Sequence, residues 1–120
     1  MTGSVSLDAY AAAWNESDAA KRAAHLETAW AVDGVYCDPT ARVTGRDALS
    51  EHIGSLRESL GEFEITSTSA YDEHHGFVHW RWRMTKDSGE PMIDGFDVAQ
   101  IDDNGQVALI VGFFEQVEGS

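Results

Sequence analysis

Three side chains in this sequence could do acid–base chemistry: Asp38, Asp97 and Tyr10. Asp38 ends the apolar run Val35 to Cys37 and is followed by Pro39, which pushes Asp38 into extended backbone. An aspartate among aromatic and apolar neighbours is poorly hydrated, which raises its pKa toward the range of a general base. Asp-Pro also starts many turns that do no chemistry, so both interpretations stand for this residue taken alone.

Asp97 alternates with small and apolar residues, namely Ile93, Gly95, Ala99 and Ile101. In a strand this pattern places its carboxylate on the apolar side, where the charge is costly unless it is paired or protonated. That placement favours a functional role. Tyr10 shares a helical apolar face with Leu7 and Trp14, and it is either a donor into a site or a core tyrosine bonded to backbone.

The stretch from His79 to Arg83 alternates two tryptophans with two arginines. Alternation along a strand lets only one of the two pairs face a pocket. Arginines in the same pocket as Asp97 would lower its pKa and make it an ion-pair partner. Because Trp80 and Trp82 are the bulkier apolar pair, we predict that the tryptophans point inward.

The histidines do not predict a metal centre. The acidic, histidine-rich stretch from Asp72 to His79 includes a predicted hairpin turn, where we expect solvated side chains instead of ligands. His52 precedes Ile53 on a helix and is expected in the core or at the rim of a cavity. Cys37 is the only cysteine, so neither an internal disulfide nor a cysteine-based zinc site can form, and we interpret it as a packing residue.

Composition bounds the class of protein. The 120 residues predict one domain, 1–120, and 42% hydrophobic residues are enough for a packed core. A net charge of −13 argues against nucleic acid or an anionic membrane as the partner. The longest apolar run, Val107 to Phe114, is too short to span a bilayer, and the N-terminus lacks the pattern of a signal peptide. We therefore expect a cytoplasmic protein.

Hydrophobic spacing predicts three helices in the first half of the chain. The first carries Leu7 to Trp14. The second runs from Ala19 to Trp30 and ends at Asp33-Gly34, and the third opens at Thr44 to Asp47 and ends at Gly61.

The remaining segments have the spacing and composition of strands. Two short strands are predicted at Val35 to Cys37 and around Ala41 to Val43. Four longer ones are predicted at Phe63 to Tyr71, Phe77 to Thr85, Met92 to Ile101 and Val107 to Val117. The connections are Asp72 to Gly76, Lys86 to Pro91 and Asp102 to Gly105, and the last contains the hairpin signal Asn-Gly.

Helices followed by a strand meander predict an α+β fold, with three helices packed on one face of a curved antiparallel sheet. The final strand is apolar on both faces, although only one face can meet the helices. We therefore predict a homodimer through the opposite, convex face of the sheet.

This order of elements resembles the cone-shaped fold of the nuclear transport factor 2 superfamily, which includes SnoaL-like polyketide cyclases and ketosteroid isomerases. The resemblance covers nearly the whole chain. It rests on Tyr10-Ala-Ala-Ala-Trp14-Asn15-Glu-Ser-Asp18, Asp33-Gly34-Val-Tyr-Cys-Asp38-Pro39, Gly45-Arg46-Asp-Ala-Leu49 and Phe96-Asp97-Val-Ala-Gln-Ile-Asp-Asp-Asn-Gly105-Gln-Val107. It implies an internal cavity but not one activity, because the superfamily hosts several kinds of enzyme and also binders.

The similarity to ketosteroid isomerases implies roles for three residues. Asp38 falls on the position of their general base, Tyr10 on that of the oxyanion tyrosine, and Asp97 on that of a protonated aspartate that donates a second hydrogen bond. The resemblance thus implies a cofactor-independent enzyme that abstracts a proton next to a carbonyl of an apolar cyclic substrate.

Ten further residues are expected to line the cavity: Trp14, Trp30, Tyr36, His52, Ile53, Leu56, Trp80, Trp82, Ile110 and Phe114. Two other functions stay open. One is a non-catalytic ligand-binding or dimerisation module. The other is an epoxide hydrolase with an Asp–Arg–Asp set from Asp97, an inward Arg81 or Arg83, and Asp38.

Overall fold

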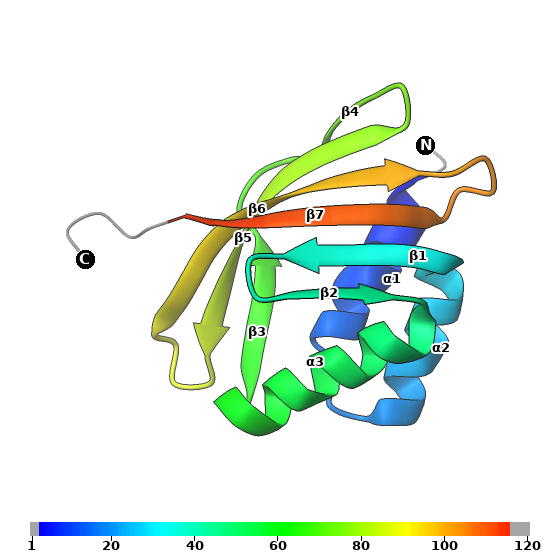
Figure 1. Ribbon diagram of the computed structural model, residues 1–120. Coiled ribbons are helices and arrows are strands. Elements are labelled where there is room, and N and C mark those ends of the chain that lie inside the picture. Colours follow the sequence, from blue (N-terminus) through cyan, green and yellow to red (C-terminus); the bar gives the residue numbers. More distant parts are fainter. Residues whose placement is uncertain (1–2, 116–120) are drawn as a thin grey trace.

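A computed structural model describes residues 3–115 of the chain (Figure 1). The helices are α1 (Gly3–Trp14), α2 (Ala19–Ala29) and α3 (Arg46–Leu60). The strands are β1 (Trp30–Asp38), β2 (Ala41–Thr44), β3 (Phe63–Ser67), β4 (Asp72–His74), β5 (Phe77–Lys86), β6 (Pro91–Ile101) and β7 (Val107–Glu115). The predicted α+β fold, with three helices packed on a curved sheet, is confirmed.

The seven strands form one sheet in the order β2-β1-β7-β6-β5-β3, and β4 pairs with the first residues of β5. The pairings are antiparallel except that of β1 with β7, which is parallel, so the sheet is mixed and not wholly antiparallel as expected. The helices cover one face, which we call the concave face; the other is the convex face (Figure 1). Strand β5 alternates exposed and buried residues along its length, as a strand covered on one face should.

Three predicted boundaries were wrong. Helix α2 ends at Ala29, because Trp30 already has extended backbone, and Asp33-Gly34 lies within β1 instead of ending a helix. The strand from Phe63 stops at Ser67 instead of reaching Tyr71. Residues Asp72–His74 form β4, because positive φ at His75 and Gly76 closes a two-residue hairpin into β5. The predicted end of the last strand, 116–117, lies outside the described residues.

Polar side chains hold the helices against β3. The guanidinium of Arg57, on α3, is buried and donates to the carbonyl oxygens of Trp14, at 2.7 Å, and Phe63, at 3.1 Å. Asn15, just after α1, exchanges two hydrogen bonds with the backbone of Ile65. These contacts fix the ends of α1 and α3 at the sheet edge, so that both helices face the concave surface.

No helix in residues 3–115 has the length and hydropathy needed to cross a membrane.

Candidate active site

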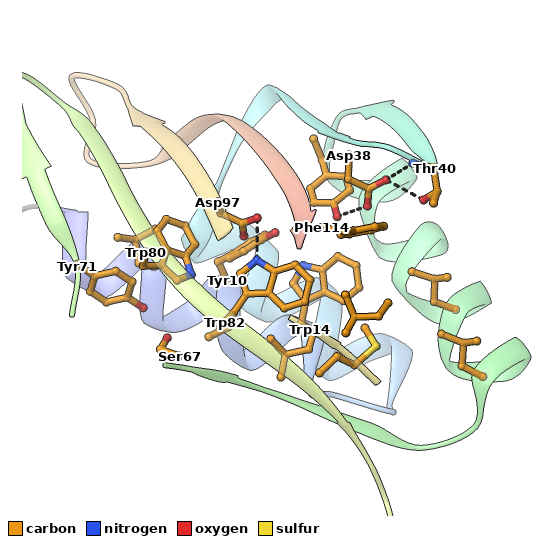
Figure 2. A pocket seen from close by; sticks show the side chains of 18 residues that line it. Tyr10, Trp14, Asp38, Thr40, Ser67, Tyr71, Trp80, Trp82, Asp97 and Phe114 are labelled. Atoms are coloured by element: carbon orange, nitrogen blue, oxygen red, sulfur yellow. Dashed lines mark hydrogen bonds between the residues drawn. The ribbon is translucent and has the colours of Figure 1, made fainter. Parts of the chain in front are cut away.

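A cavity of about 210 Å³ lies between the helices and the concave face (Figure 2). Eighteen residues line it: Leu7, Tyr10, Ala11, Trp14, Tyr36, Asp38, Thr40, Leu56, Leu60, Ile65, Ser67, Tyr71, Trp80, Trp82, Met84, Ile93, Asp97 and Phe114. Most are apolar or aromatic, the two aspartates are their only carboxyl groups, and none of the eighteen is Lys, Arg or His. The cavity therefore disfavours anionic ligands.

The three acid–base candidates all reach this cavity, together with Trp14, Tyr36, Leu56, Trp80, Trp82 and Phe114. Four expected wall residues do not line it. Trp30, Ile53 and Ile110 are fully buried in the core, and the ring of His52 packs against Trp14 and Tyr36. Helical or strand spacing alone does not separate a core position from a cavity position, because both lie on the same buried face.

Several lining residues were missed in the sequence. Leu7 and Met84 follow the same periodicity as the predicted residues, so the pattern contained their signal. Ser67 and Tyr71 lie at and beyond the end of β3, where no periodicity applies. Thr40 follows Asp38-Pro39 in the β1–β2 turn, and Leu60 is the last residue of α3.

Asp97 is the most strongly perturbed carboxyl group of the cavity. It projects from the middle of β6, is 7% exposed, and accepts a 3.0 Å hydrogen bond from the indole nitrogen of Trp82 (Figure 2). Burial raises the pKa of Asp97 from 3.8 to about 7; the Trp82 bond lowers this pKa and the charge of Asp38 raises it. Glycine at 112 makes room, since a Cβ there would lie 2.8 Å from Asp97 Oδ1. Asp97 can therefore gain or lose a proton near neutral pH.

Replacing Trp82 by phenylalanine should raise the pKa of Asp97 above 7, because the indole N–H favours the ionised carboxylate. The pKa is measured by following the ¹³C shift of the Asp97 carboxyl carbon against pH. Trp80→Phe is the matched control, because Trp80 is two residues away on the same strand and, although its backbone lies opposite that of Asp97, its indole makes no hydrogen bond to Asp97 among the described residues. An unchanged or lowered pKa in Trp82→Phe would contradict this prediction.

Asp38 is held in a turn by four hydrogen bonds. Its Oδ1 accepts from the backbone N–H and the hydroxyl of Thr40, both at 2.7 Å, and from the N–H of Ala41 at 3.0 Å. Its Oδ2 accepts a 2.5 Å bond from the hydroxyl of Tyr36 (Figure 2). The carboxylate thus builds the β1–β2 turn, as the turn interpretation of Asp-Pro predicted, and it also reaches the cavity wall.

The two tyrosines nearest the carboxylates are buried. Tyr10 stacks on Trp30 with ring centres 5.6 Å apart, and burial, followed by the charge of Asp97, raises its pKa well above the ordinary value. The pKa of Tyr36 is also raised, first by burial. Both hydroxyls therefore keep their protons at physiological pH and can act as hydrogen-bond donors.

The arginines of β5 lie on the convex face. Arg81 pairs with Glu115, and Arg83 makes two bonds to Asp94, at 2.7 and 3.0 Å. Trp80 and Trp82 line the cavity, so the prediction that the tryptophans face inward is confirmed. The predicted Asp–Arg–Asp set of an epoxide hydrolase is therefore wrong, because the pleat of β5 directs both arginines away from the cavity.

His74 and His75 are exposed at the β4–β5 turn, and no cluster of three metal-binding side chains occurs within residues 3–115.

The helix-covered, curved mixed sheet and its apolar cavity define a cone of the nuclear transport factor 2 class, as the sequence predicted. The family model of the SnoaL-like domain matches residues 7–110. The chain therefore belongs to the SnoaL-like family.

Solved structures agree with this assignment. A candidate isomerase of the SnoaL-like family from Agrobacterium tumefaciens is 26% identical, with a TM-score of 0.89, over 96% of this chain and 98% of that one. A candidate polyketide cyclase from Sinorhizobium meliloti is 17% identical, with a TM-score of 0.70, over 89% and 92%.

A hypothetical protein from Catenulispora acidiphila with a ketosteroid isomerase-like fold, in complex with trimethylamine, is also 17% identical. Its TM-score is 0.72 over 92% of this chain and 85% of that one. No curated protein matches the chain.

Proposed function

We propose that this protein is a cofactor-independent enzyme that moves a proton next to a carbonyl group of a small, apolar, cyclic substrate. The observation that carries the proposal is Asp97, a buried carboxyl group in an apolar cavity with a pKa of about 7. A group with that pKa is present in both protonation states at neutral pH, which suits it to accept and return a proton. Family members described as candidate isomerases and polyketide cyclases support the class of reaction.

In the proposed reaction, ionised Asp97 takes a proton from the carbon next to the carbonyl. The electron pair of that C–H bond moves into the enolate, and the hydroxyl of Tyr10 donates a hydrogen bond to the enolate oxygen. Where the substrate carries a C=C bond next to that carbon, the enolate is a dienolate, and Asp97 returns the proton to the far carbon of that bond while the double bond shifts. The result is an isomer, with no net oxidation and no leaving group.

Two observations favour Asp97 over Asp38 as the group that exchanges the proton. Asp38 already accepts four hydrogen bonds, three on Oδ1 and one on Oδ2 from the Tyr36 hydroxyl. Asp97 accepts one bond, on Oδ1, and its Oδ2 has no partner among residues 3–115. The assignment of Asp38 as base, with neutral Asp97 and Tyr10 as donors, stays the alternative prediction.

The size of the cavity narrows the substrate class. Its 210 Å³ is below the roughly 300–1,000 Å³ that is typical of pockets for drug-sized ligands. We therefore propose one or two rings instead of a four-ring skeleton. The direct test incubates the protein with small cyclic enones and ketones in D₂O and follows deuterium entry next to the carbonyl by NMR. No enhanced exchange with any of them, above that of Asp97→Asn and Asp38→Asn proteins, would overturn the proposal.

A second candidate function is the binding of a small organic cation without catalysis. The cavity combines two carboxylates with several aromatic rings and no basic side chain, which suits an ammonium group. The structure of the Catenulispora acidiphila protein in complex with trimethylamine supports this candidate. Titration with trimethylamine distinguishes the two: a cation bound in the cavity lowers the pKa of Asp97, whereas a neutral ketone does not.

We also propose a homodimer through the convex face. The rings of Phe96 and Phe113 stack there with centres 5.0 Å apart, and Phe113 is 46% exposed. The neighbouring Leu109 and Val111 are only partly buried. A cytoplasmic location likewise remains a prediction.

Phe113→Asp should convert the dimer to a monomer at micromolar concentration, because it would place a charge in the centre of an apolar contact. Sedimentation velocity measures the change. Val5→Asp is the control, since Val5 is an exposed apolar residue on α1, away from the convex face. A wild-type protein that is already monomeric, or a Phe113→Asp protein that remains dimeric, would contradict the prediction.

A further inference from the structure

The cavity has a second polar region, at the opposite end from Asp38 and Thr40, with Asp97 between the two (Figure 2). Three residues form it: Ser67 at the end of β3, Tyr71 in the loop before β4, and Trp80 on β5. We call this group the distal site. None of the three takes part in the proton transfer described above, so their polar atoms need another explanation.

The indole nitrogen of Trp80 is the central observation. Trp80 is 5% exposed and lines the cavity, yet within residues 3–115 its N–H has no hydrogen-bond partner. The N–H of Trp82, two residues along the same strand, is by contrast used by Asp97. Among the described residues the fully enclosed indole nitrogens without a partner are those of Trp14 and Trp30, so the Trp80 nitrogen, which is not one of them, opens onto the cavity. A ligand that displaces water from this N–H without replacing its hydrogen bond would lose about 1–3 kcal/mol, so a ligand in the cavity is expected to bring a partner for it. An indole only donates, so this partner must be an acceptor.

Tyr71 and Ser67 complete the distal site. The ring of Tyr71 packs edge-on against Trp80, with centres 5.3 Å apart at 82°. Burial raises the pKa of Tyr71, the adjacent Ser67 hydroxyl lowers it and the charge of Asp8 raises it. Both residues line the same end of the cavity as Trp80 (Figure 2), and their hydroxyls can donate to a ligand there.

The charge around the distal site decides the kind of acceptor. None of the eighteen lining residues is basic, and the nearby Asp8 and Asp97 are acidic. A carboxylate or phosphate would therefore lie in a negative potential with no cation to pair with. A neutral oxygen has no such penalty.

We propose that Trp80, Tyr71 and Ser67 bind a neutral oxygen atom, of a carbonyl, ether or hydroxyl group, at the end of the substrate remote from the reacting carbonyl. This inference rests on the proposed function and specifies its substrate class: a one- or two-ring ketone that carries a second, uncharged oxygen. The two oxygens would fix the direction in which the molecule lies in the cavity, and so which carbon meets Asp97.

The test compares two bicyclic ketones, 2-tetralone and 6-methoxy-2-tetralone, which differ by one remote ether oxygen. Affinity is measured by NMR titration. The methoxy compound should bind about 3- to 10-fold more tightly to the wild type, the value of one hydrogen bond. Trp80→Phe should reduce this ratio to about 1, and Tyr71→Phe should reduce it in part. The ratio cancels any general loss of affinity that a variant suffers.

Trp14→Phe is the matched control, because Trp14 is another buried, cavity-lining tryptophan whose indole nitrogen has no partner among the described residues, but it lies outside the distal site. It should leave the ratio unchanged. Three results would overturn the proposal. The affinity ratio of the two ketones could stay at its wild-type value in both Trp80→Phe and Tyr71→Phe. The wild type could bind the 6-carboxylate analogue more tightly than the methoxy compound, or it could bind neither ketone. Deuterium exchange is scored separately, so failed catalysis with an intact ratio would reject the proposed function alone.

Discussion

Asp97→Asn is expected to lower the rate of proton exchange next to a substrate carbonyl by at least about 100-fold, the usual worth of a general base. Asparagine has nearly the same shape and can still accept the bond from Trp82, but it has no basic oxygen. Asp38→Asn should cost less, about 10-fold, because its main contacts build the turn to Thr40 and Ala41. Exchange is measured by NMR in D₂O with the best ketone from the panel.

The alternative assignment predicts the reverse order. With Asp38 as base, Asp38→Asn would be the most damaging change, and Tyr10→Phe and Asp97→Ala would be less so. The pH profile separates the two assignments independently. If Asp97 is the base, the rate rises as pH increases through about 7; if neutral Asp97 is a donor, the rate falls over the same range.

The ionisation of Asp97 is also expected to have a large effect on the free energy of unfolding. The pKa of Asp97 is about 7 in the folded protein and near the ordinary 3.8 when unfolded, so between these values the folded state holds a proton that the unfolded state has lost. The contribution of this group to the free energy of unfolding is therefore fully present below about pH 4 and is lost as pH rises through 7. Between pH 5 and 8 the expected loss is about 3 kcal/mol.

Asp97→Asn should remove this part of the pH dependence and leave the protein more stable than the wild type at pH 8. Urea unfolding at pH 5 and pH 8 measures both effects. Asp94→Asn is the control, because Asp94 is a carboxylate at the surface whose pKa is lowered by Arg83. A wild type that is no less stable at pH 8 than at pH 5, relative to Asp97→Asn, would contradict the raised pKa. An ionised, buried Asp97 lowers the free energy of unfolding, and such a loss of stability is common at functional sites.

The sequence by itself determined the elements and their inward faces. Helical spacing identified the three helices, and alternation identified the strands and the inward direction of Trp80 and Trp82, because these patterns record which face of each element is buried. Motifs spread over nearly the whole chain indicated the superfamily. Local rules were weakest where tertiary pairing overrides them, as at β4, or where burial on one face does not tell a packed core from a cavity, as at Trp30 and Ile110.

Only the tertiary structure decided how the candidate residues are used. Asp38 and Asp97 look equivalent along the chain, yet folding surrounds Asp38 with four donors and leaves Asp97 with one, in an apolar wall. The distal site was invisible in the sequence, because Ser67, Tyr71 and Trp80 come from a strand end, a loop and another strand. Hydration, hydrogen bonding and charge at a point in a cavity depend on segments that are distant in sequence. The raised pKa of Asp97 and the free N–H of Trp80 therefore exist only in the folded protein, where the helices cover the sheet.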